Sequence, residues 1–392
     1  MTIDELRRRV AEFLAANDPG TTDRTDFLRA RYDAGLAWVG FPVGHGGLGA
    51  DQALQPEVDR LFAGVGAPDN DPAANGIGLG MAAPTILAYG TEEQKRRFLG
   101  PLWTGEERWC QLFSEPGAGS DLANVSTRAV RDGDGWVVNG QKVWTSQAQN
   151  ARFAILVART DPDAVKHAGL TYFLCDMTDP GVDVRPLRQI TGEAEFNEVF
   201  LTDVRIPDTQ RLGSEGEGWR VANTTLNNER VSIGKGGERE TGMIGRVART
   251  WREHPDRRTP QLQERLLRLW VEAEVARITG VRLVQKLADG QPGPPEGSVL
   301  KLLFARNAQE LSGLEVELLG EDGLRYSDWT MVRPTHVEFT GRDAGFRYLR
   351  AKGNSIEGGT SEIIRNIVAE RVLGLPAEHR ADKDRPWKEL AR

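Results

Sequence analysis

The stretch Cys110-Gln-Leu-Phe-Ser-Glu-Pro-Gly-Ala-Gly-Ser-Asp121 and the later run Gly140-Gln-Lys-Val-Trp-Thr-Ser146 are the most informative parts of this chain. In the first run, Gly117 and Gly119 flank a tight turn. Without side chains at these positions, backbone N–H groups and neighbouring hydroxyls can approach a flat heteroaromatic ring closely. The first run therefore predicts one side of a ring-binding cradle.

The second run supplies the complementary side of that cradle. Trp144 ends an alternating strand, where its indole can cover one face of a ring, and Thr145 and Ser146 can hydrogen-bond to the ring's polar edge. Each run also has an ordinary structural explanation. A Ser-Glu-Pro-Gly sequence is usually a simple turn, and a tryptophan in a strand is usually part of the core. The occurrence of both runs in one chain favours the cradle.

Composition limits the classes of protein that need to be considered. At 392 residues the chain can form two or three domains, and its net charge of −7 argues against nucleic acid or an anionic membrane surface as the main partner. The first residues are charged, and no window approaches about 18 uninterrupted apolar residues, so we expect a cytoplasmic protein without membrane insertion. The five histidines lack ligand spacing, which predicts no metal site. Cys110 and Cys175 lie in apolar runs, and we expect both to be buried reduced thiols.

Hydrophobic periodicity divides the chain into three parts. Residues 1–107 have helical spacing, residues 108–212 form short alternating strands, and residues 213–392 return to long helices. The sequence Asp132-Gly-Asp-Gly135 is a hairpin signal, which favours a small antiparallel β-domain in the centre. We expect later helices over Leu226–Ile233, Gln261–Leu287, Ser298–Leu319 and Thr360–Leu373. The Gly- and Pro-rich stretch Gly290–Gly297 predicts a loop between helices.

Three further motifs, in order along the chain, complete a resemblance to the acyl-CoA dehydrogenase family. Gly40–Gly49 is similar to the family's loop between its first helices, and Tyr89–Lys95 is similar to the helix before its β-domain. The run Gly358-Gly-Thr-Ser-Glu-Ile-Ile-Arg-Asn-Ile-Val-Ala-Glu-Arg371 is similar to the start of a helix in its last domain. The resemblance implies an α+β fold with an N-terminal all-α domain (1–107), a central small antiparallel β-barrel domain (108–212) and a C-terminal four-helix-bundle domain (213–392).

The resemblance also implies a chemistry, the α,β-desaturation of an acyl thioester with FAD as cofactor. A proton leaves Cα while a hydride leaves Cβ for flavin N5, because no amino-acid side chain can accept a hydride. The protein must supply a base in a dry pocket that raises a carboxylate pKa toward the operating pH. It must also polarise the thioester carbonyl by hydrogen bonds.

Two glutamates are candidates for that base. In the commoner arrangement of the family a glutamate directly precedes Gly-Thr, but here that position is Gly358, which cannot act as a base. Other members carry the base in a Leu-x-x-Glu-Arg run, which Leu226-Asn-Asn-Glu-Arg230 matches, so we assign Glu229 as the base. Glu357 remains its rival because it lies one residue from the commoner position. The plain structural alternative for Glu229 is an ion pair on a solvated helix face.

The remaining roles are carried over by matching position. We expect Thr360 to open a helix as its N-cap, beside the anionic diphosphate or ribityl part of the flavin. The expected cofactor-binding residues are Gln111, Leu112, Phe113, Ser114, Gly119, Ser120, Trp144, Thr145, Ser146, Thr360, Ser361 and Glu362. The expected substrate-binding residues are Ser120, Asn227, Arg230, Gly358 and Gly359.

Two segments depart from the family pattern and leave the assembly open. Arg252–Pro260 and Glu317–Gly323 stand where many members carry residues that reach a neighbouring subunit's cofactor, and the carboxylates of Glu317 and Glu321 are unfavourable beside a diphosphate. The chain is therefore a homotetramer or homodimer with altered contacts, or one subunit of an α2β2 assembly with a homologous chain. The expected partners are an acyl-CoA substrate and an electron-transfer flavoprotein. The alternatives are a dehydrogenase or oxidase of carrier-protein thioesters and a catalytically silent subunit.

Overall fold

The computed structural model describes residues 1–392 except 234–238, 289–295, 338–341, 381, 383 and 391–392. The chain forms two compact units. The first consists of Met1–Arg185, Asn197–Thr225 and Lys383–Arg392, and the second consists of Pro186–Phe196 and Leu226–Asp382. The N-terminal helices and the sheet belong to one unit. The three domain boundaries expected from the sequence remain a prediction.

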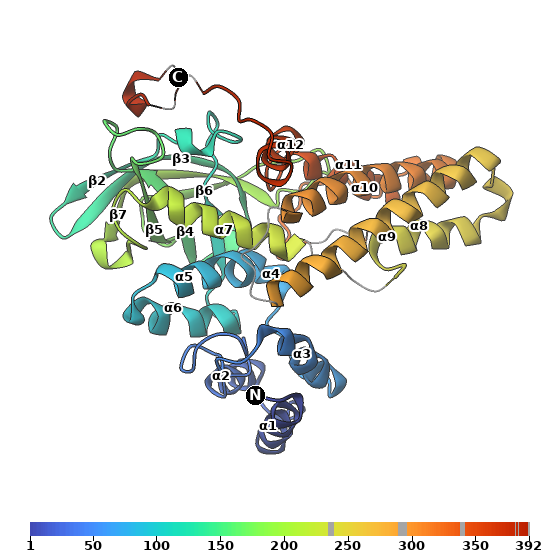
Figure 1. The fold of residues 1–392 in the computed structure, drawn as a ribbon, viewed down its shortest axis with the longest axis horizontal. Helices are drawn as coiled ribbons and strands as arrows, with labels where there is room; N and C mark the ends of the chain where they lie inside the picture. The colour runs from blue at the N-terminus through green and yellow to red at the C-terminus, as the bar shows by residue number, and fades with distance from the viewer. Residues whose placement is uncertain (234–238, 289–295, 338–341, 381, 383, 391–392) are drawn as a thin grey trace. The chain divides into compact units, whose positions relative to one another are not determined.

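The first unit begins with six helices (Figure 1): α1 (Ile3–Ala16), α2 (Arg24–Asp33), α3 (Gln55–Gly64), α4 (Pro72–Ile77), α5 (Ala83–Tyr89) and α6 (Glu92–Thr104). Thr2 caps α1 in a capping box with Glu5, which satisfies backbone donors that the first turn would otherwise leave free. Phe13, Phe27 and Phe62 meet edge to face, with ring centroids 5.4–6.0 Å apart. These aromatic contacts join α1, α2 and α3 in one core.

The sheet follows in the same unit. Its strands are β1 (Trp109–Leu112), β2 (Arg128–Asp132), β3 (Gly135–Ser146), β4 (Phe153–Arg159), β5 (Leu170–Asp176), β6 (Val182–Pro186) and β7 (Phe196–Pro207). The strand order is β1-β4-β2-β3-β7-β6, and β5 pairs with β4. The predicted hairpin is confirmed, since Asp132 pairs with Gly135 where β2 turns into β3. One detail differs from expectation: β1 runs parallel to β4, so the sheet is mixed rather than wholly antiparallel.

Apolar side chains fill one side of this sheet. Alternate residues of the strands, among them Trp136, Val138 and Phe173, form one buried cluster. Cys110 and Cys175 belong to the same cluster as free, buried thiols, as the sequence predicted. Burial raises the pKa of both thiols far above the physiological range, so they remain protonated and unreactive.

The second unit is helical. Helix α7 (Gly218–Ile233) begins in the first unit and ends in the second, which continues with α8 (Gly242–Glu253), α9 (Pro260–Ala288), α10 (Glu296–Leu319), α11 (Ala344–Ala351) and α12 (Ser361–Ile367). α10 contacts α8, α9, α11 and α12, and its buried leucines lie in a common core with Val247 and Leu269. These helices and the sheet confirm the α+β class. Residues 290–295 of the loop predicted at Gly290–Gly297 lie outside the described part of the chain, and α10 begins at Glu296.

A buried lysine joins the two informative sequence runs. Lys142 of β3 is fully buried, and its Nζ donates hydrogen bonds of 2.9 Å each to Glu115 Oε1, Phe113 O and Val157 O. An ammonium group has three hydrogens, so all of its donors are used. The contact holds the segment that follows β1 against β3.

Glu115 is the anionic partner in this contact and is equally well satisfied. Its carboxylate accepts from the Ser126 N–H and hydroxyl and from the Thr127 N–H at 2.7–2.9 Å. Burial by itself would raise the pKa of Glu115, but Lys142 and these donors lower it to about 2. Since the folded state depresses this pKa, the stabilisation is complete above the ordinary value of 4.5 and is lost as the pH falls toward about 2.

Replacement of Lys142 by methionine should therefore destabilise the chain strongly. Lys142→Met leaves the Glu115 carboxylate buried without its cation, and we expect the free energy of unfolding to fall by about 3–5 kcal/mol in urea denaturation. The double variant Lys142→Met/Glu115→Gln should recover part of that loss. Lys95→Met, which removes a cation from the solvent-exposed Glu92, is the matched control and should have a far smaller effect. Equal losses in Lys142→Met and Lys95→Met would contradict the assignment.

Candidate active site

The two sequence runs lie side by side in the first unit. The Val143 N–H donates to Ser114 O at 2.9 Å, which joins β3 to the segment after β1. Glu115 and Ala118 exchange two backbone hydrogen bonds of 3.0 and 3.1 Å and so close the predicted tight turn around Pro116 and Gly117. The cradle inferred from sequence is therefore brought together by backbone pairing as well as by the buried ion pair.

The glycines of this turn leave open space. A Cβ added to Gly117 or Gly119 would meet no described atom within 4 Å, and neither residue has a positive φ. Glycine is thus required at these positions neither by backbone conformation nor by packing inside the chain. The two glycines leave the backbone accessible to a flat ligand.

Trp144 has a strained backbone and an outward side chain. Its φ is +60°, which is an outlier for a bulky residue, and its side chain is 58% exposed. The strain is held on both sides, since Val143 is bonded to Ser114 and Asn197 Nδ2 donates to Thr145 O at 3.1 Å. An exposed indole held in this conformation is compatible with the ring-stacking role expected from the sequence.

Two polar groups beside Trp144 are buried without a partner. Thr145 Oγ1 and Gln147 Nε2 have no hydrogen-bond partner among the described residues. Such groups are expensive to bury unless a ligand or water satisfies them. An open turn, an exposed indole and an unpaired hydroxyl together fit the polar edge and flat face of a flavin. Gln147 was missed by sequence reasoning, although it directly follows Ser146.

The other expected cofactor residues of this unit differ in their exposure to solvent. Gln111 and Ser114 are partly exposed, and Ser120 is exposed. Leu112 is fully buried in the core of the sheet, and the Phe113 ring packs edge to face on Tyr172 at 5.8 Å. Any contact of Leu112 with a cofactor would therefore come from its backbone rather than its side chain.

The rival base Glu357 is held by an arginine of the second unit. Arg350 Nη1 and Nη2 donate to Glu357 Oε1 and Oε2 at 3.2 and 3.0 Å, a bidentate pair. The Arg350 side chain is buried, and its Nε also lies 3.8 Å from Glu195 Oε2. Burial raises the pKa of Glu195 to about 7, against the opposing attraction of Arg350. Arg350 thus bridges two carboxylates, a contact that no local sequence pattern had indicated.

The turn after Glu357 needs its glycines. Gly358 and Gly359 have φ of +64° and +97°, in the region that favours glycine, and the buried Lys301 donates to Gly359 O. Thr360 then caps α12, because its Oγ1 accepts from the Ile363 N–H at 3.3 Å. The predicted N-cap is confirmed.

The expected substrate-binding residues of α7 are only partly described. Asn227 is exposed on α7. The side chains of Glu229 and Arg230 lie outside the described residues, although the backbone of α7 is described through Ile233. Glu229, Glu357, Gly358 and Thr360 belong to the second unit, whereas the Ser114–Ser146 cradle belongs to the first.

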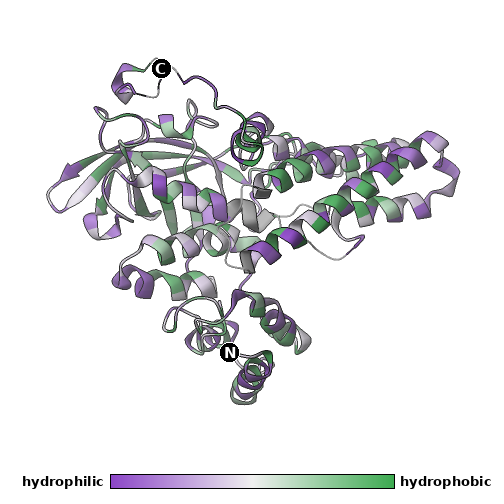
Figure 2. Ribbon diagram, in the orientation of Figure 1, coloured by the Kyte–Doolittle hydropathy of each residue, from purple (hydrophilic) through white to green (hydrophobic). Residues whose placement is uncertain are grey.

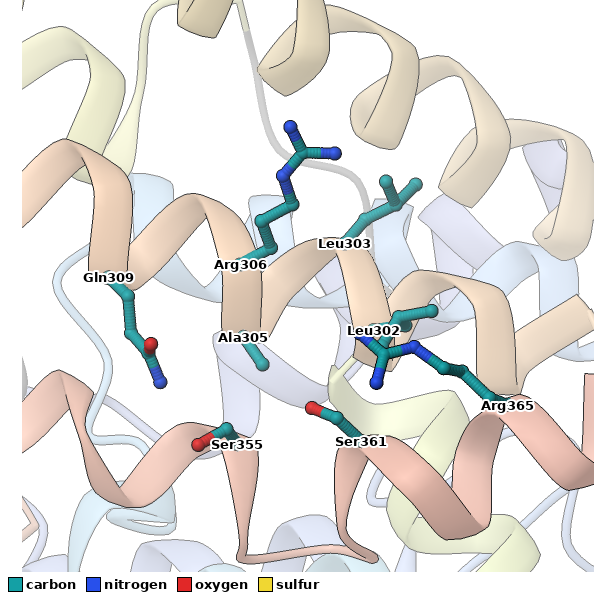
Figure 3. A pocket seen from close by; sticks show the side chains of 8 residues that line it. All are labelled: Leu302, Leu303, Ala305, Arg306, Gln309, Ser355, Ser361 and Arg365. Carbon is teal, nitrogen blue, oxygen red and sulfur yellow. The ribbon is translucent and has the colours of Figure 1, made fainter.

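A cavity of about 430 Å³ lies beside α12 (Figure 3). Its lining is formed by Leu302, Leu303, Ala305, Arg306, Gln309, Ser355, Ser361 and Arg365. In Figure 3, Gln309 points toward Ser355, and Arg365 reaches toward Leu302 on α10. Arg306 and Arg365 also contact Glu272 and Glu362 at 3.3 and 3.4 Å, so both cations are already partly neutralised. The cavity adjoins Ser361, one of the expected cofactor residues.

Two carboxylates of the divergent Glu317–Gly323 segment lie beside arginines. Glu317 pairs with Arg265, and Asp322 lies 3.4 Å from Arg257. The repulsion expected from Glu317 is thereby reduced inside the chain itself. Within the described ranges, no group of three or more histidine, cysteine, aspartate or glutamate side chains could hold a metal ion. None of the described helices is long and apolar enough to cross a membrane.

Comparisons with known proteins identify the family of the chain. Three family models match the chain: acyl-CoA dehydrogenase N-terminal domain at residues 2–106, middle domain at 110–204 and C-terminal domain at 216–373. Acyl-CoA dehydrogenase IpdE1 of Mycobacterium tuberculosis is 40% identical over 349 residues, which cover 88% of this chain and 86% of the relative.

Solved structures give the same result. The steroid ACAD Tcur3481-Tcur3483 is similar with a TM-score of 0.74 and 25% identity, over 96% of this chain and 98% of that one. The ChsE4-ChsE5 complex from Mycobacterium tuberculosis has a TM-score of 0.70 and 29% identity over the same shares. The chain therefore belongs to the acyl-CoA dehydrogenase family of FAD-dependent oxidoreductases, which act on CH–CH bonds.

Proposed function

We propose that this chain desaturates an acyl thioester between Cα and Cβ, with Glu229 as the base and an electron-transfer flavoprotein as electron acceptor. The observation that carries the proposal is the cradle of the first unit, in which an open turn, the exposed Trp144 and the unpaired Thr145 hydroxyl are held together. When bound there, FAD supplies the acceptor for the hydride that leaves Cβ.

The chain's own residues perform the remaining tasks. Trp144 would cover one face of a bound ring, Thr145 would hydrogen-bond to its edge, and the Gly117–Ser120 turn would offer backbone donors. Packing of a ring and an acyl chain against these groups excludes water, which favours proton abstraction by a carboxylate.

The choice of base rests on how Glu357 is engaged. A carboxylate held on both oxygens by a buried arginine is fixed in orientation, and it would have to leave that pair to reach a substrate carbon. Glu229 lies in the Leu226–Arg230 run of α7 that matches the alternative arrangement of the family. We therefore keep Glu229 as the base, and Asn227 and Arg230 as residues near the substrate.

The substrate class is proposed from the descriptions of similar proteins. One of the solved relatives is described as a steroid ACAD, which makes a thioester with a bulky ring system the first candidate. Anaerobic titration of the purified yellow protein with straight-chain, branched and steroid-derived acyl-CoA thioesters tests the function as a whole. Bleaching of the flavin by one class supports it, whereas a flavin that no thioester bleaches contradicts it for the chain on its own. We retain the sequence-based expectation of a cytoplasmic location.

One face of α9 suggests that the chain assembles with another subunit. Apolar side chains along this helix are exposed at intervals of three or four residues, and this spacing places them on one helical face. Figure 2 shows hydrophobic bands, in green, between hydrophilic ones along the α9 ribbon. They are Leu267, Val271, Val275, Ile278, Val281 and Val284. A continuous exposed apolar face marks an interaction surface. We propose that a second subunit, either this chain or a homologous one, covers it.

Replacement of the proposed base should abolish turnover without loss of the cofactor. We expect Glu229→Gln to retain FAD and to lose about 10²–10⁴-fold in kcat, the usual contribution of a general base, measured with an artificial electron acceptor. Glu357→Gln should keep kcat within about tenfold, since that glutamate pairs with Arg350. The reverse ranking of the two variants would transfer the role to Glu357.

Removal of the unpaired hydroxyl should separate cofactor binding from folding. Thr145→Val deletes a buried group that has no partner among the described residues, so the apo protein should be at least as stable as wild type. Its dissociation constant for FAD should rise about tenfold, as for the loss of one hydrogen bond, measured by flavin fluorescence. Thr191→Val removes a similarly unpaired hydroxyl from the second unit and is the control. Unchanged FAD affinity in Thr145→Val would exclude its role.

Charges placed on the α9 face should disrupt the assembly. We expect Val271→Asp/Val275→Asp to lower the molar mass measured by light scattering, because buried unpaired carboxylates oppose association. Leu324→Asp introduces the same charge at an exposed leucine outside α9 and should leave the mass unchanged. If the wild-type chain is already monomeric by itself, co-expression with a homologous subunit distinguishes the mixed assembly.

A further inference from the structure

The C-terminal segment of the chain returns to the first unit. The family model of the last domain ends at residue 373, whereas residues Lys383–Arg392 group with the sheet rather than with the helices that precede them. A short turn of 3₁₀ helix, Trp387–Glu389, forms the docked part. This segment therefore lies beyond the part that the family model matches.

Trp387 anchors the segment. Its side chain is buried, and its Nε1 donates to Asn124 Oδ1 at 2.8 Å. The backbone N–H groups of Trp387 and Lys388 donate to Ala164 O and Pro162 O at 2.9 and 3.0 Å. The segment is thus bound by side-chain and backbone contacts to two separate loops of the first unit.

The indole also covers a buried arginine. The Arg159 guanidinium carbon lies 4.3 Å from the centroid of the Trp387 ring, within the range of a cation–π contact. Arg159 is almost fully buried and donates to Ala123 O, Val125 O and Lys166 O at 2.7–3.1 Å. Arg159 thus binds the backbone of the segment after Ser120, and the Trp387 ring packs on its guanidinium group.

A second contact holds the same segment. Lys166 Nζ lies 2.9 and 3.0 Å from the two carboxylate oxygens of Asp121, and the Asn124 N–H donates to Asp121 O at 2.9 Å. Asp121 directly follows the exposed Ser120 of the open turn. Contacts made through Trp387, Arg159 and Lys166 therefore converge on residues 121–125, next to the cradle.

We propose that the C-terminal segment Arg385–Leu390 is a clamp that holds the Asp121–Val125 turn, and through it Gly119 and Ser120, in the conformation that binds the cofactor. Trp387 and Arg159 are positioning residues in this proposal, and neither touches the reacting atoms. The proposal rests on the proposed function only in taking Ser120 to face the flavin. A tail that served only to stabilise the fold would not act selectively on this turn.

The test uses the full-length chain with Trp387→Ala and Trp387→Phe. In hydrogen exchange of the apo protein, Trp387→Ala should lose protection at residues 119–125, while the β2–β3 hairpin keeps it. Its dissociation constant for FAD should rise about tenfold or more, as for the loss of a hydrogen bond and a cation–π contact. Trp387→Phe keeps a ring over Arg159 but loses the Nε1 donor, so its effect should be intermediate.

Trp329→Ala is the matched control, since Trp329 stacks on Tyr326 in the second unit. It should leave both the exchange at 119–125 and the FAD affinity unchanged. The clamp is overturned if Trp387→Ala lowers only the melting temperature, with exchange and affinity as in wild type. Failure of the proposed function would appear separately, as a wild-type chain that binds no FAD, and the exchange data would still decide whether Trp387 holds the turn.

Discussion

The buried ion pair between Lys142 and Glu115 is the contact on which the candidate site depends. It joins a strand of the sheet to a turn 27 residues earlier in the chain and uses every donor of the ammonium group. A buried pair of this kind contributes little net stability but makes the loss of either partner costly. It therefore specifies which backbone segments lie together. The position of the open turn relative to Trp144 follows from that constraint.

Around this contact the chain places a strained residue and a buried hydroxyl. Trp144 is exposed and held at a positive φ, and the hydroxyl of Thr145 is buried with no partner among the described residues. Local strain and unpaired polar groups persist only where the surrounding structure enforces them. Their concentration at the end of one strand gives the cradle a physical signature that is independent of family resemblance.

In the second unit, the pairing of one glutamate bears on the choice between two candidate bases. Sequence position alone leaves both Glu229 and Glu357 open, because each matches or nearly matches an arrangement known in the family. Arg350 engages Glu357 on both carboxylate oxygens and lies near Glu195 as well. A carboxylate engaged on both oxygens has a fixed orientation, and this favours the other candidate in our proposal. The clamp proposed for Trp387 is a second case in which a distant residue orients a functional loop.

The sequence by itself determined the features that depend on a few neighbouring residues. The α+β class, the Asp132–Gly135 hairpin, the Thr360 cap and the two buried thiols could all be predicted from it. Turn chemistry, capping and periodicity act over at most about 18 neighbouring residues, so the local sequence contains them. Only the tertiary structure decided the parallel pairing of β1 with β4, the Arg350–Glu357 pair and the contact of Trp387 with Asn124, 263 residues away. Each of these contacts joins segments that are distant in sequence, and it forms only when the whole chain folds. No local sequence preference specifies which distant groups meet.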